Sequence, residues 1–375
     1  MRRLTAAMAS ALVGGVILAA VSLSPVIGAP PTGNDALFSG KALTRLNILE
    51  TSIAAAGACG LPATAITNLI SAMAAAPQLT PASGHSGTKV CGNINPVADT
   101  HLTASALTSM WAWGNAVPQS KDSRGLGEEA FQPQTIAHYS ATKGLANVRL
   151  SVPWAADQGD AIRSWVSASV AALHASGQTV SALGGDVGWV SNPALVSQWI
   201  TAAHTAAPFN SIQLDVEPWA TTGNWTTNLP AIASYVAMVK QAETTAHSLG
   251  MKLGIDAPWW LSTTPFRSGT VLSAVLPYVN TVSIIAFSDH AAGTDGIIAQ
   301  AWPAVEEASG ALVPFTIGVQ TSSDSVAGGS QYTFADKGSA VLEAECAKVR
   351  TAYAASALYS GVTVEEYLSW LSLGK

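Results

Sequence analysis

The sequence predicts an α/β protein, a closed (β/α)8 barrel with an N-terminal helical extension. From about residue 105, short β-branched or apolar runs alternate with longer Ala-rich amphipathic stretches, a pattern typical of parallel strands joined by crossover helices. Eight such units over about 265 residues match the usual size of this barrel, the TIM barrel. A doubly wound open sheet needs fewer strands and usually has a Gly-rich phosphate loop after its first strand, where this chain has Trp111-Ala112-Trp113-Gly114.

The predicted strands are short and almost continuously apolar, as expected for strands that are covered on both faces. In chain order they are Leu107–Trp113, Asn147–Val152, Thr179–Leu183, Ser211–Val216, Lys252–Asp256, Thr281–Phe287, Pro314–Val319 and Tyr359–Val364. The predicted helices between them include Ala161–Ala175, Pro193–Ala206, Ile232–Leu249, Val271–Tyr278, Ala299–Ala308 and Gly338–Ala355. Residues 106–375 therefore form the predicted barrel domain.

Residues 1–29 have the pattern of a secretory signal peptide. Arg2 and Arg3 precede the apolar run Leu12–Val21, and small residues up to Ala29 precede two prolines. We expect cleavage after Ala29 and a secreted, extracellular protein. An uncleaved membrane anchor is the alternative, although the apolar run is short for a bilayer span of roughly 20 residues.

Residues 30–105 form the predicted helical extension, which contains two of the three cysteines. In an exported protein pairing is the default, and Cys59 and Cys91 are the expected disulfide. Cys346 lies in a helical run and is expected to be a buried thiol. Because no Cys/His group has the spacing of metal ligands, we expect no metal and no cofactor.

Composition limits the partners of this chain. Charged residues make up 11% of it, and the formal net charge is −6. Proteins that bind nucleic acid need a basic stripe, so nucleic acid is an unfavourable partner. A second apolar span is absent from the sequence, so we expect no membrane contact after signal cleavage. We also expect a monomer.

Carboxylates and tryptophans gather at the C-terminal ends of the predicted strands, where barrels of this type build their active sites. Around the barrel these positions are Trp111 and Trp113; Arg149 and Trp154; Gly184, Gly185, Asp186 and Trp189; Asp215, Glu217 and Trp219; Asp256, Trp259 and Trp260; Asp289 and His290; Gln320; Glu365 and Glu366. A sugar ring has apolar C–H faces and a polar hydroxyl rim, so aromatic faces beside carboxylates favour a carbohydrate partner.

Asp215 and Glu217 are the predicted catalytic pair. They lie two residues apart at the end of an apolar strand, so their side chains project to the same side. Two close carboxylates raise each other's proton affinity, and one can remain protonated as a general acid. In the structural alternative, one carboxylate caps a helix and the other pairs with Arg149. The predicted substrate-binding residues are Trp113, Arg149, Trp154, Asp186, Gln213, Trp219, Asp256, Trp259, Asp289, Gln320 and Glu365.

The fourth strand resembles the strand signature of the family 18 chitinase-like glycoside hydrolases, commonly written DxxDxDxE. Asp215 and Glu217 match its last two acids, whereas Asn210 and Gln213 stand in place of the first two. This element is the specific part of the resemblance, and it implies a divergent member with a (β/α)8 barrel.

Two further segments are similar to elements of the same family. Ala182-Leu183-Gly184-Gly185 resembles its SxGG element with Ala in place of Ser, and Ala286-Phe287-Ser288-Asp289 resembles its Tyr-Asp element without the Tyr. The resemblance implies that Glu217 protonates the leaving glycosidic oxygen. It also implies that Asp215 supports an N-acetyl group that acts as an internal nucleophile.

Other assignments stay open. A separate carboxylate opposite Glu217 could take the second role, with Asp256, Asp289 or Glu365 as candidates. Glu217-Pro218 is also similar to the Asn-Glu-Pro element of the large retaining-glycosidase clan, which needs a Glu at the end of strand 7, where this chain has Gln320.

We therefore expect a secreted glycoside hydrolase that cleaves a polysaccharide or glycoconjugate by carboxylate general acid/base catalysis. A carbohydrate-binding barrel without catalysis is the alternative, which the departures at Gln213 and Phe287 would permit. A metal-dependent deacetylase requires at least two His residues near a carboxylate. Because His290 is the single His at a predicted strand end, the sequence does not favour this class.

Overall fold

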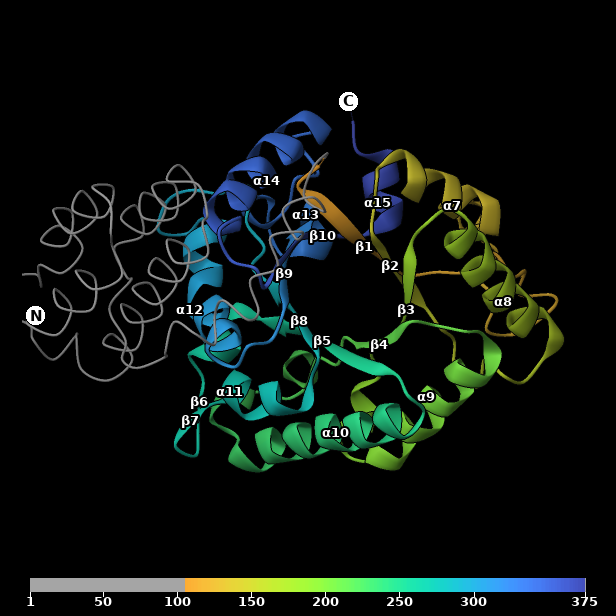
Figure 1. Ribbon diagram of the computed structural model, residues 1–375, viewed down its shortest axis with the longest axis horizontal. Coiled ribbons are helices and arrows are strands. Elements are labelled where there is room, and N and C mark those ends of the chain that lie inside the picture. Colours follow the sequence, from red (N-terminus) through yellow and green to blue (C-terminus); the bar gives the residue numbers. More distant parts are fainter. Residues whose placement is uncertain (1–104, 375) are drawn as a thin grey trace, which may run out of the picture.

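The computed structural model describes residues 105–374 (Figure 1). The predicted signal segment, residues 30–104 and the predicted disulfide partners Cys59 and Cys91 lie outside the described residues. In the described part, no helix has both the length and the apolar character needed to cross a bilayer. The same residues contain no group of three or more His, Cys, Asp or Glu side chains that could hold a metal ion.

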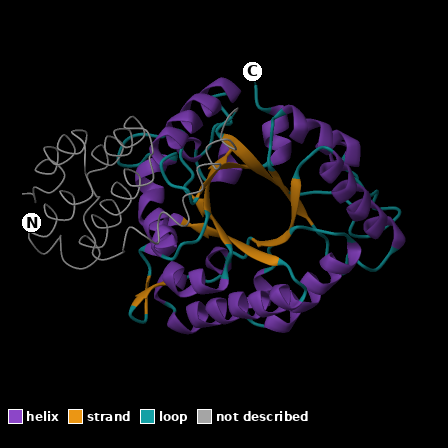
Figure 2. Ribbon diagram, in the orientation of Figure 1, coloured by secondary structure: helices purple, strands orange, loops and turns teal. Residues whose placement is uncertain are grey.

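Eight parallel strands close into a barrel, which Figures 1 and 2 show end-on with helices around it. The strands are β1 (Leu107–Ala112), β2 (Asn147–Ser151), β3 (Thr179–Gly184), β4 (Ser211–Leu214), β5 (Lys252–Pro258), β8 (Thr281–Ile285), β9 (Phe315–Gln320) and β10 (Tyr359–Glu365). Their order around the ring is β1-β10-β9-β8-β5-β4-β3-β2, and β1 pairs with β2 as well as with β10. The predicted (β/α)8 fold is confirmed.

Helices follow the strands and cover the outside of the ring (Figure 2). They are α7 (Pro133–Thr142), α8 (Asp160–Ala175), α9 (Pro193–Ala206), α10 (Leu229–Ser248), α11 (Val271–Val275), α12 (Ile297–Gly310), α13 (Asp324–Ala327), α14 (Ser339–Tyr353) and α15 (Tyr367–Ser372). Short 3-10 turns are η2 (Glu129–Phe131), η3 (Val187–Val190), η4 (Pro218–Ala220), η5 (Trp225–Thr227), η6 (Trp259–Ser262), η7 (Leu276–Tyr278) and η8 (Ser330–Tyr332).

Local sequence explains where several helices begin. Proline occupies the first turn of α7, α9 and α10, where a missing N–H costs no helical hydrogen bond. Asn228 also caps α10 by accepting a hydrogen bond from the N–H of Ala231. On α14, Cys346 is fully buried and unpaired, which confirms the prediction of a buried thiol.

The strand β4 ends at Leu214, earlier than the sequence predicts. The N–H of Asp215 still donates to the carbonyl of Gly184 (2.9 Å). Pro218 then has no N–H to offer and restricts the backbone of Glu217 before it, so the chain leaves the sheet and enters η4. This turn places both predicted catalytic carboxylates at the C-terminal end of the barrel.

A small antiparallel hairpin, β6 (Pro265–Phe266) with β7 (Gly269–Thr270), lies between β5 and α11. The sequence did not predict it, because strands of two residues are too short to show an alternating pattern. The side chain of Thr270 ends the hairpin by capping α11, since it accepts a hydrogen bond from the N–H of Ser273.

The inside of the barrel is polar, whereas side chains such as Met110, Ile212 and Val364 on the outer face are fully buried in the apolar core. Bulky branched residues usually fill a barrel of this kind. Here Trp111 occupies much of the centre and is 1% exposed. A Cβ atom on Gly318 would lie 3.0 Å from the Cη2 atom of Trp111, so the glycine provides the room that this ring needs.

Hydroxyl groups form a connected network across the barrel interior. Ser109 Oγ lies 2.6 Å from Thr363 Oγ1, and Thr363 donates to Thr316 Oγ1 at 2.9 Å. Ser283 Oγ lies 2.9 Å from the same Thr316 oxygen, which also accepts a hydrogen bond from Arg149 (3.1 Å). Polar side chains in a closed barrel are thus satisfied by one another.

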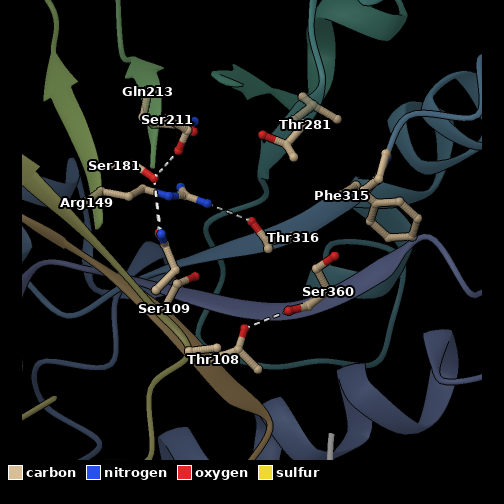
Figure 3. A pocket seen from close by; sticks show the side chains of 14 residues that line it. Thr108, Ser109, Arg149, Ser181, Ser211, Gln213, Thr281, Phe315, Thr316 and Ser360 are labelled. Carbon is tan, nitrogen blue, oxygen red and sulfur yellow. Dashed lines mark hydrogen bonds between the residues drawn. The ribbon is translucent and has the colours of Figure 1, made fainter. Parts of the chain in front are cut away.

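A cavity of about 240 Å³ opens at the N-terminal ends of the strands (Figure 3). Its lining includes Ser181 and Ser211, which hydrogen-bond to each other (2.8 Å), and the side chain of Arg149. Neither Asp215 nor Glu217 lines it. This cavity is therefore distinct from the C-terminal end of the barrel, where the predicted catalytic carboxylates lie.

Candidate active site

The two predicted catalytic carboxylates follow β4. The backbone of Asp215 packs so closely on Gly185 that a Cβ atom at position 185 would overlap the Asp215 carbonyl oxygen. The same hypothetical atom would lie 3.5 Å from Cη2 of Trp113, so this ring extends from the end of β1 to the Asp215 backbone. The glycine of the SxGG-like element thus allows the backbone of Asp215 and the indole of Trp113 to lie close together.

Asp215 has an unusual environment. Its Oδ1 atom is buried and has no hydrogen-bond partner among residues 105–374. Burial raises the pKa of Asp215 well above its ordinary value of 3.8, and the negative charges of Asp256, Glu217 and Glu365 raise it further, while Arg149 opposes them. A carboxyl group in this position holds a proton and keeps a polar atom available for a ligand.

Glu217 lies one step further out and is half-buried. Burial raises its pKa, a hydrogen bond with Trp219 lowers it, and the charge of Asp256 raises it. A glutamic acid with a raised pKa can carry a proton at a pH where an ordinary carboxyl has lost it, which is the requirement for a general acid.

Asp256 lies beneath this pair, inside the barrel and 1% exposed. Its Oδ1 atom accepts hydrogen bonds from Arg149 (3.0 Å) and Gln213 (2.8 Å), and its Oδ2 atom accepts one from Trp111 (2.9 Å). Burial raises the pKa of Asp256, and these donors together with Ser283 oppose the rise. Because Arg, Gln and Trp can only donate here, the geometry suits an ionised carboxylate.

Three residues predicted to contact substrate, namely Arg149, Gln213 and Asp256, therefore lie inside the barrel and bond to one another. The alternation of side chains along β2, β4 and β5 turns them inward, below the strand ends. The structural alternative for the catalytic pair is wrong in its partner, since Arg149 forms its ion pair with Asp256.

Glu365 is, after Asp256, the second carboxyl group near the pair. It follows Thr363 by two residues on β10, and Thr363 contacts the hydroxyls inside the barrel, so Glu365 is on the inward side. Burial raises the pKa of Glu365 well above its ordinary value, and the charges of Asp256, Glu366 and Glu217 add to this, while Arg149 opposes it. One buried cation thus faces several carboxyl groups.

Aromatic rings flank Glu217 on one side. Trp219 packs edge-on against Trp260 (centroids 5.1 Å apart), Trp225 (5.4 Å) and Tyr235 (6.0 Å). Of the other predicted aromatic contacts, Trp259 is half-buried and Trp154 is exposed. Trp219, Trp259 and Trp260 follow β4 and β5, so they lie at the end of the barrel that carries the carboxylates.

The remaining predicted residues have local partners. Asp186 is exposed and caps η3 by accepting from Gly188 N–H (2.7 Å). Gln320 is buried, and its Oε1 atom accepts from the backbone of the two residues that follow it. Asp289 pairs with His290 (2.7 Å) and Lys337 (3.3 Å). These bonds hold the strand-end loops in place. Asp186, Gln320 and Asp289 are therefore not members of the carboxyl cluster that contains Asp215, Glu217 and Glu365.

Sequence reasoning missed two groups of residues. The inward hydroxyls could have been found from small polar residues such as Ser283 and Thr316 at alternate positions of otherwise apolar strands. It also missed the pair Asp122–Arg124, which joins the loops after β1 and β2. Its signal was weak, because most of the partners of Arg124 are backbone carbonyls about thirty residues away.

Comparison with known proteins gives structural similarity alone. No protein-family model matches the chain, and no curated protein matches it. A GH18 chitinase from Pseudoalteromonas aurantia is 11% identical, with 70% of this chain and 94% of that chain covered and a TM-score of 0.47. A class V chitinase from Pseudomonas fluorescens Pf-5 is 16% identical over 58% of this chain and 69% of that one, with a TM-score of 0.38.

A third similar structure is the GH18 chitinase from Cycas revoluta in complex with (GlcNAc)3. It is 11% identical, with 57% of this chain and 68% of that chain covered and a TM-score of 0.39.

Proposed function

We propose that the protein is a glycoside hydrolase in which Glu217 is the general acid. The observation that carries this proposal is the pair Asp215 and Glu217 at the C-terminal end of β4, both with a raised pKa and both beside indole rings. Barrels of this class do their chemistry at that end. Carboxyls that hold protons above their ordinary range are suited to acid catalysis on a neutral substrate.

The proposed reaction is substrate-assisted hydrolysis of an N-acetylated sugar, as the resemblance of the fourth strand implies. Glu217 gives its proton to the glycosidic oxygen, which takes the electron pair of the breaking C–O bond. The acetamido oxygen of the sugar then bonds to the anomeric carbon. Asp215 accepts a hydrogen bond from the amide N–H and orients this group. Water later attacks the same carbon and gives a proton to Glu217, while the bond between that carbon and the acetamido oxygen breaks and its electron pair returns to the acetamido group.

The buried ion pair has a supporting role in this proposal. Asp256 and Arg149 do not reach a substrate; their charges act on the pKa of Asp215 in opposite directions. Gln213 connects β4 to Asp256 directly (2.8 Å). The pair thereby adds, from inside the barrel, to the effect that burial has on the pKa of Asp215.

The test is hydrolysis by the purified full chain of a panel of polysaccharides, beginning with chitin oligosaccharides because the proposed reaction needs an N-acetyl group. Glu217→Gln keeps the shape of the side chain and removes the transferable proton. Turnover should fall about 100- to 10,000-fold, the usual contribution of a general acid, while sugar binding persists. Glu129→Gln, an exposed position in η2, is the matched control and should retain parental turnover.

Near-normal turnover by Glu217→Gln on a cleaved substrate would place the acid elsewhere, with Glu365 as the next candidate. Binding of oligosaccharides without cleavage by the parent protein would favour the non-catalytic alternative.

A further inference from the structure

One arginine ties together the loops that follow β1 and β2. Arg124 uses all five of its N–H groups. Its Nε and Nη2 atoms donate to the two carboxylate oxygens of Asp122 (2.8 and 2.6 Å). Its Nη1 atom donates to the carbonyls of Trp154 and Ala155, and Nη2 donates to that of Gln158, each at 2.6 Å. A lysine has three N–H groups and no planar fork, so it cannot reproduce this set.

The loop after β2 has the backbone that this arginine requires. Ala155 has φ +50°, a left-handed conformation that residues other than glycine rarely adopt. Gly159 has φ +85°, and a Cβ atom there would lie 2.8 Å from Arg124 Nη2 and 2.9 Å from Asp122 Oδ2. The turn at Ala155 therefore brings successive carbonyls to one nitrogen, and Gly159 leaves space for the guanidinium.

The ion pair within this assembly persists in acid. The hydrogen bond from Arg124 lowers the pKa of Asp122 to about 2, so Asp122 stays ionised at any pH at which a glycosidase would work. The main chain of the β1 loop is fixed as well, because the amide of Asn115, 3% exposed, donates to the carbonyl of Arg124 (3.1 Å). The loop after β2 is thus held by a rigid support.

Trp154 is adjacent to the left-handed turn and is 44% exposed, more than any other tryptophan of the chain. Its loop begins at the C-terminal end of the barrel, where Trp113 follows the neighbouring strand β1. When a flat apolar face covers an exposed indole, the free energy of the complex falls. The C–H face of a sugar is such a surface.

We propose that Arg124 is a positioning residue that holds Trp154 as an outer stacking platform for a sugar unit away from Glu217. This inference rests on the proposed function and specifies that the substrate is a chain rather than a single glycoside. An oligosaccharide long enough to reach Trp154 gains affinity from the indole, whereas one that occupies only the positions beside Asp215 and Glu217 gains nothing.

The test is calorimetric titration of chitin disaccharide and hexasaccharide into the full chain carrying Glu217→Gln, which prevents cleavage. The variants added to it are Trp154→Ala, Arg124→Met and both together. Arg163→Met is the matched control, since it removes one exposed positive charge from the first turn of the following helix α8. Trp154→Tyr serves as the conservative rescue, because it keeps an aromatic face.

Trp154→Ala should weaken hexasaccharide binding about 3- to 10-fold, the worth of one aromatic contact, and leave disaccharide binding unchanged. Arg124→Met should cause the same length-dependent loss and should add nothing in the Trp154→Ala background, because both changes remove one interaction. Trp154→Tyr should restore most of the hexasaccharide affinity, and Arg163→Met should match the parent.

Equal losses for both oligosaccharides, or additive losses in the double variant, would overturn the positioning role. Hexasaccharide affinity that is unaffected by Trp154→Ala would overturn this inference while leaving the proposed function intact. Absence of binding of either oligosaccharide to the parent would overturn both, and would do so before any variant is compared.

Discussion

Replacing Asp215 by Asn should stabilise the protein at neutral pH, by an amount that grows as the pH rises. In the unfolded chain this carboxyl loses its proton near the ordinary value of 3.8, whereas burial and neighbouring negative charges hold the proton to a much higher pH in the folded protein. Between the two values the folded state binds one more proton. Stability from this group is therefore complete below about pH 4 and is lost as the pH rises through the folded pKa.

The magnitude follows from linkage. One extra proton on the folded state lowers the free energy of unfolding by about 1.4 kcal/mol for each pH unit. The amide of the Asp215→Asn variant does not titrate, so the variant should gain on the parent by about 1.4 kcal/mol for each pH unit between the ordinary pKa and the raised pKa of the folded state. Near pH 4 the two proteins should differ by only about 0.5 kcal/mol, because the carboxyl of the unfolded chain is then still partly protonated.

Urea unfolding followed by tryptophan fluorescence, at pH values from 4 to 7, measures this difference. Asp336→Asn is the control, since its side chain is 50% exposed, and it should leave the pH dependence of the parent unchanged. A variant Asp215→Asn that is no more stable than the parent at neutral pH, with the same dependence on pH, would refute the assignment of a protonated, unpartnered carboxyl at this position.

Three other outcomes are expected. Arg149→Met should lower the free energy of unfolding by about 3 to 5 kcal/mol, because it leaves Asp256 buried and unpaired; thermal unfolding measures this, and a loss below about 1 kcal/mol would contradict the ion pair. Exported protein should begin after Ala29, and N-terminal sequencing that starts far from that point would contradict the proposed signal cleavage. Non-reducing peptide mapping should recover Cys59 joined to Cys91, and a bridge to any other cysteine would overturn this pairing.

The strand end with the strongest local pattern was predicted best. Asp215 and Glu217 follow an apolar run at a spacing of two, and the single residue Pro218 stops the strand behind them. Strand spacing fixes which side chains share a face, whatever the rest of the fold does. The position of the candidate catalytic pair could therefore be read from a few consecutive residues.

The partners inside the barrel could not be predicted in the same way. Arg149 lies between Val148 and Leu150, which are fully buried, so the sequence shows an ion within an apolar strand but not which acid meets it. Asp256 lies far along the chain, and it becomes the partner through the closure of the ring. Long-range pairing of this kind depends on the register of many strands at once.

The sequence also did not predict which strand-end side chains are bonded to their own turns. The side-chain oxygens of Asp186 and Gln320 accept hydrogen bonds from backbone N–H groups one or two residues along the chain. Such short-range caps are common for Asp, Asn and similar side chains, and they compete with a role at a site. The sequence marks the position of these residues but not whether a turn has already used them.

The hydroxyls inside the barrel have a definite direction. Thr316 Oγ1 accepts from both Thr363 and Arg149, so its own proton is left to point at Ser283. Thr363 has donated its proton, and so it accepts from Ser109. The hydrogen bonds therefore run one way, from Ser109 through Thr363 and Thr316 to Ser283.

Ser283 in turn donates to Asp256, so every O–H dipole of the row is aligned toward one carboxylate. Aligned hydrogen bonds polarise one another in a medium of low permittivity. The row thus solvates a negative charge as a file of oriented water molecules would, but with no freedom to rearrange. The row therefore stabilises the ionised form of Asp256, whose charge raises the pKa of Asp215 from below, with dipoles that need not reorient.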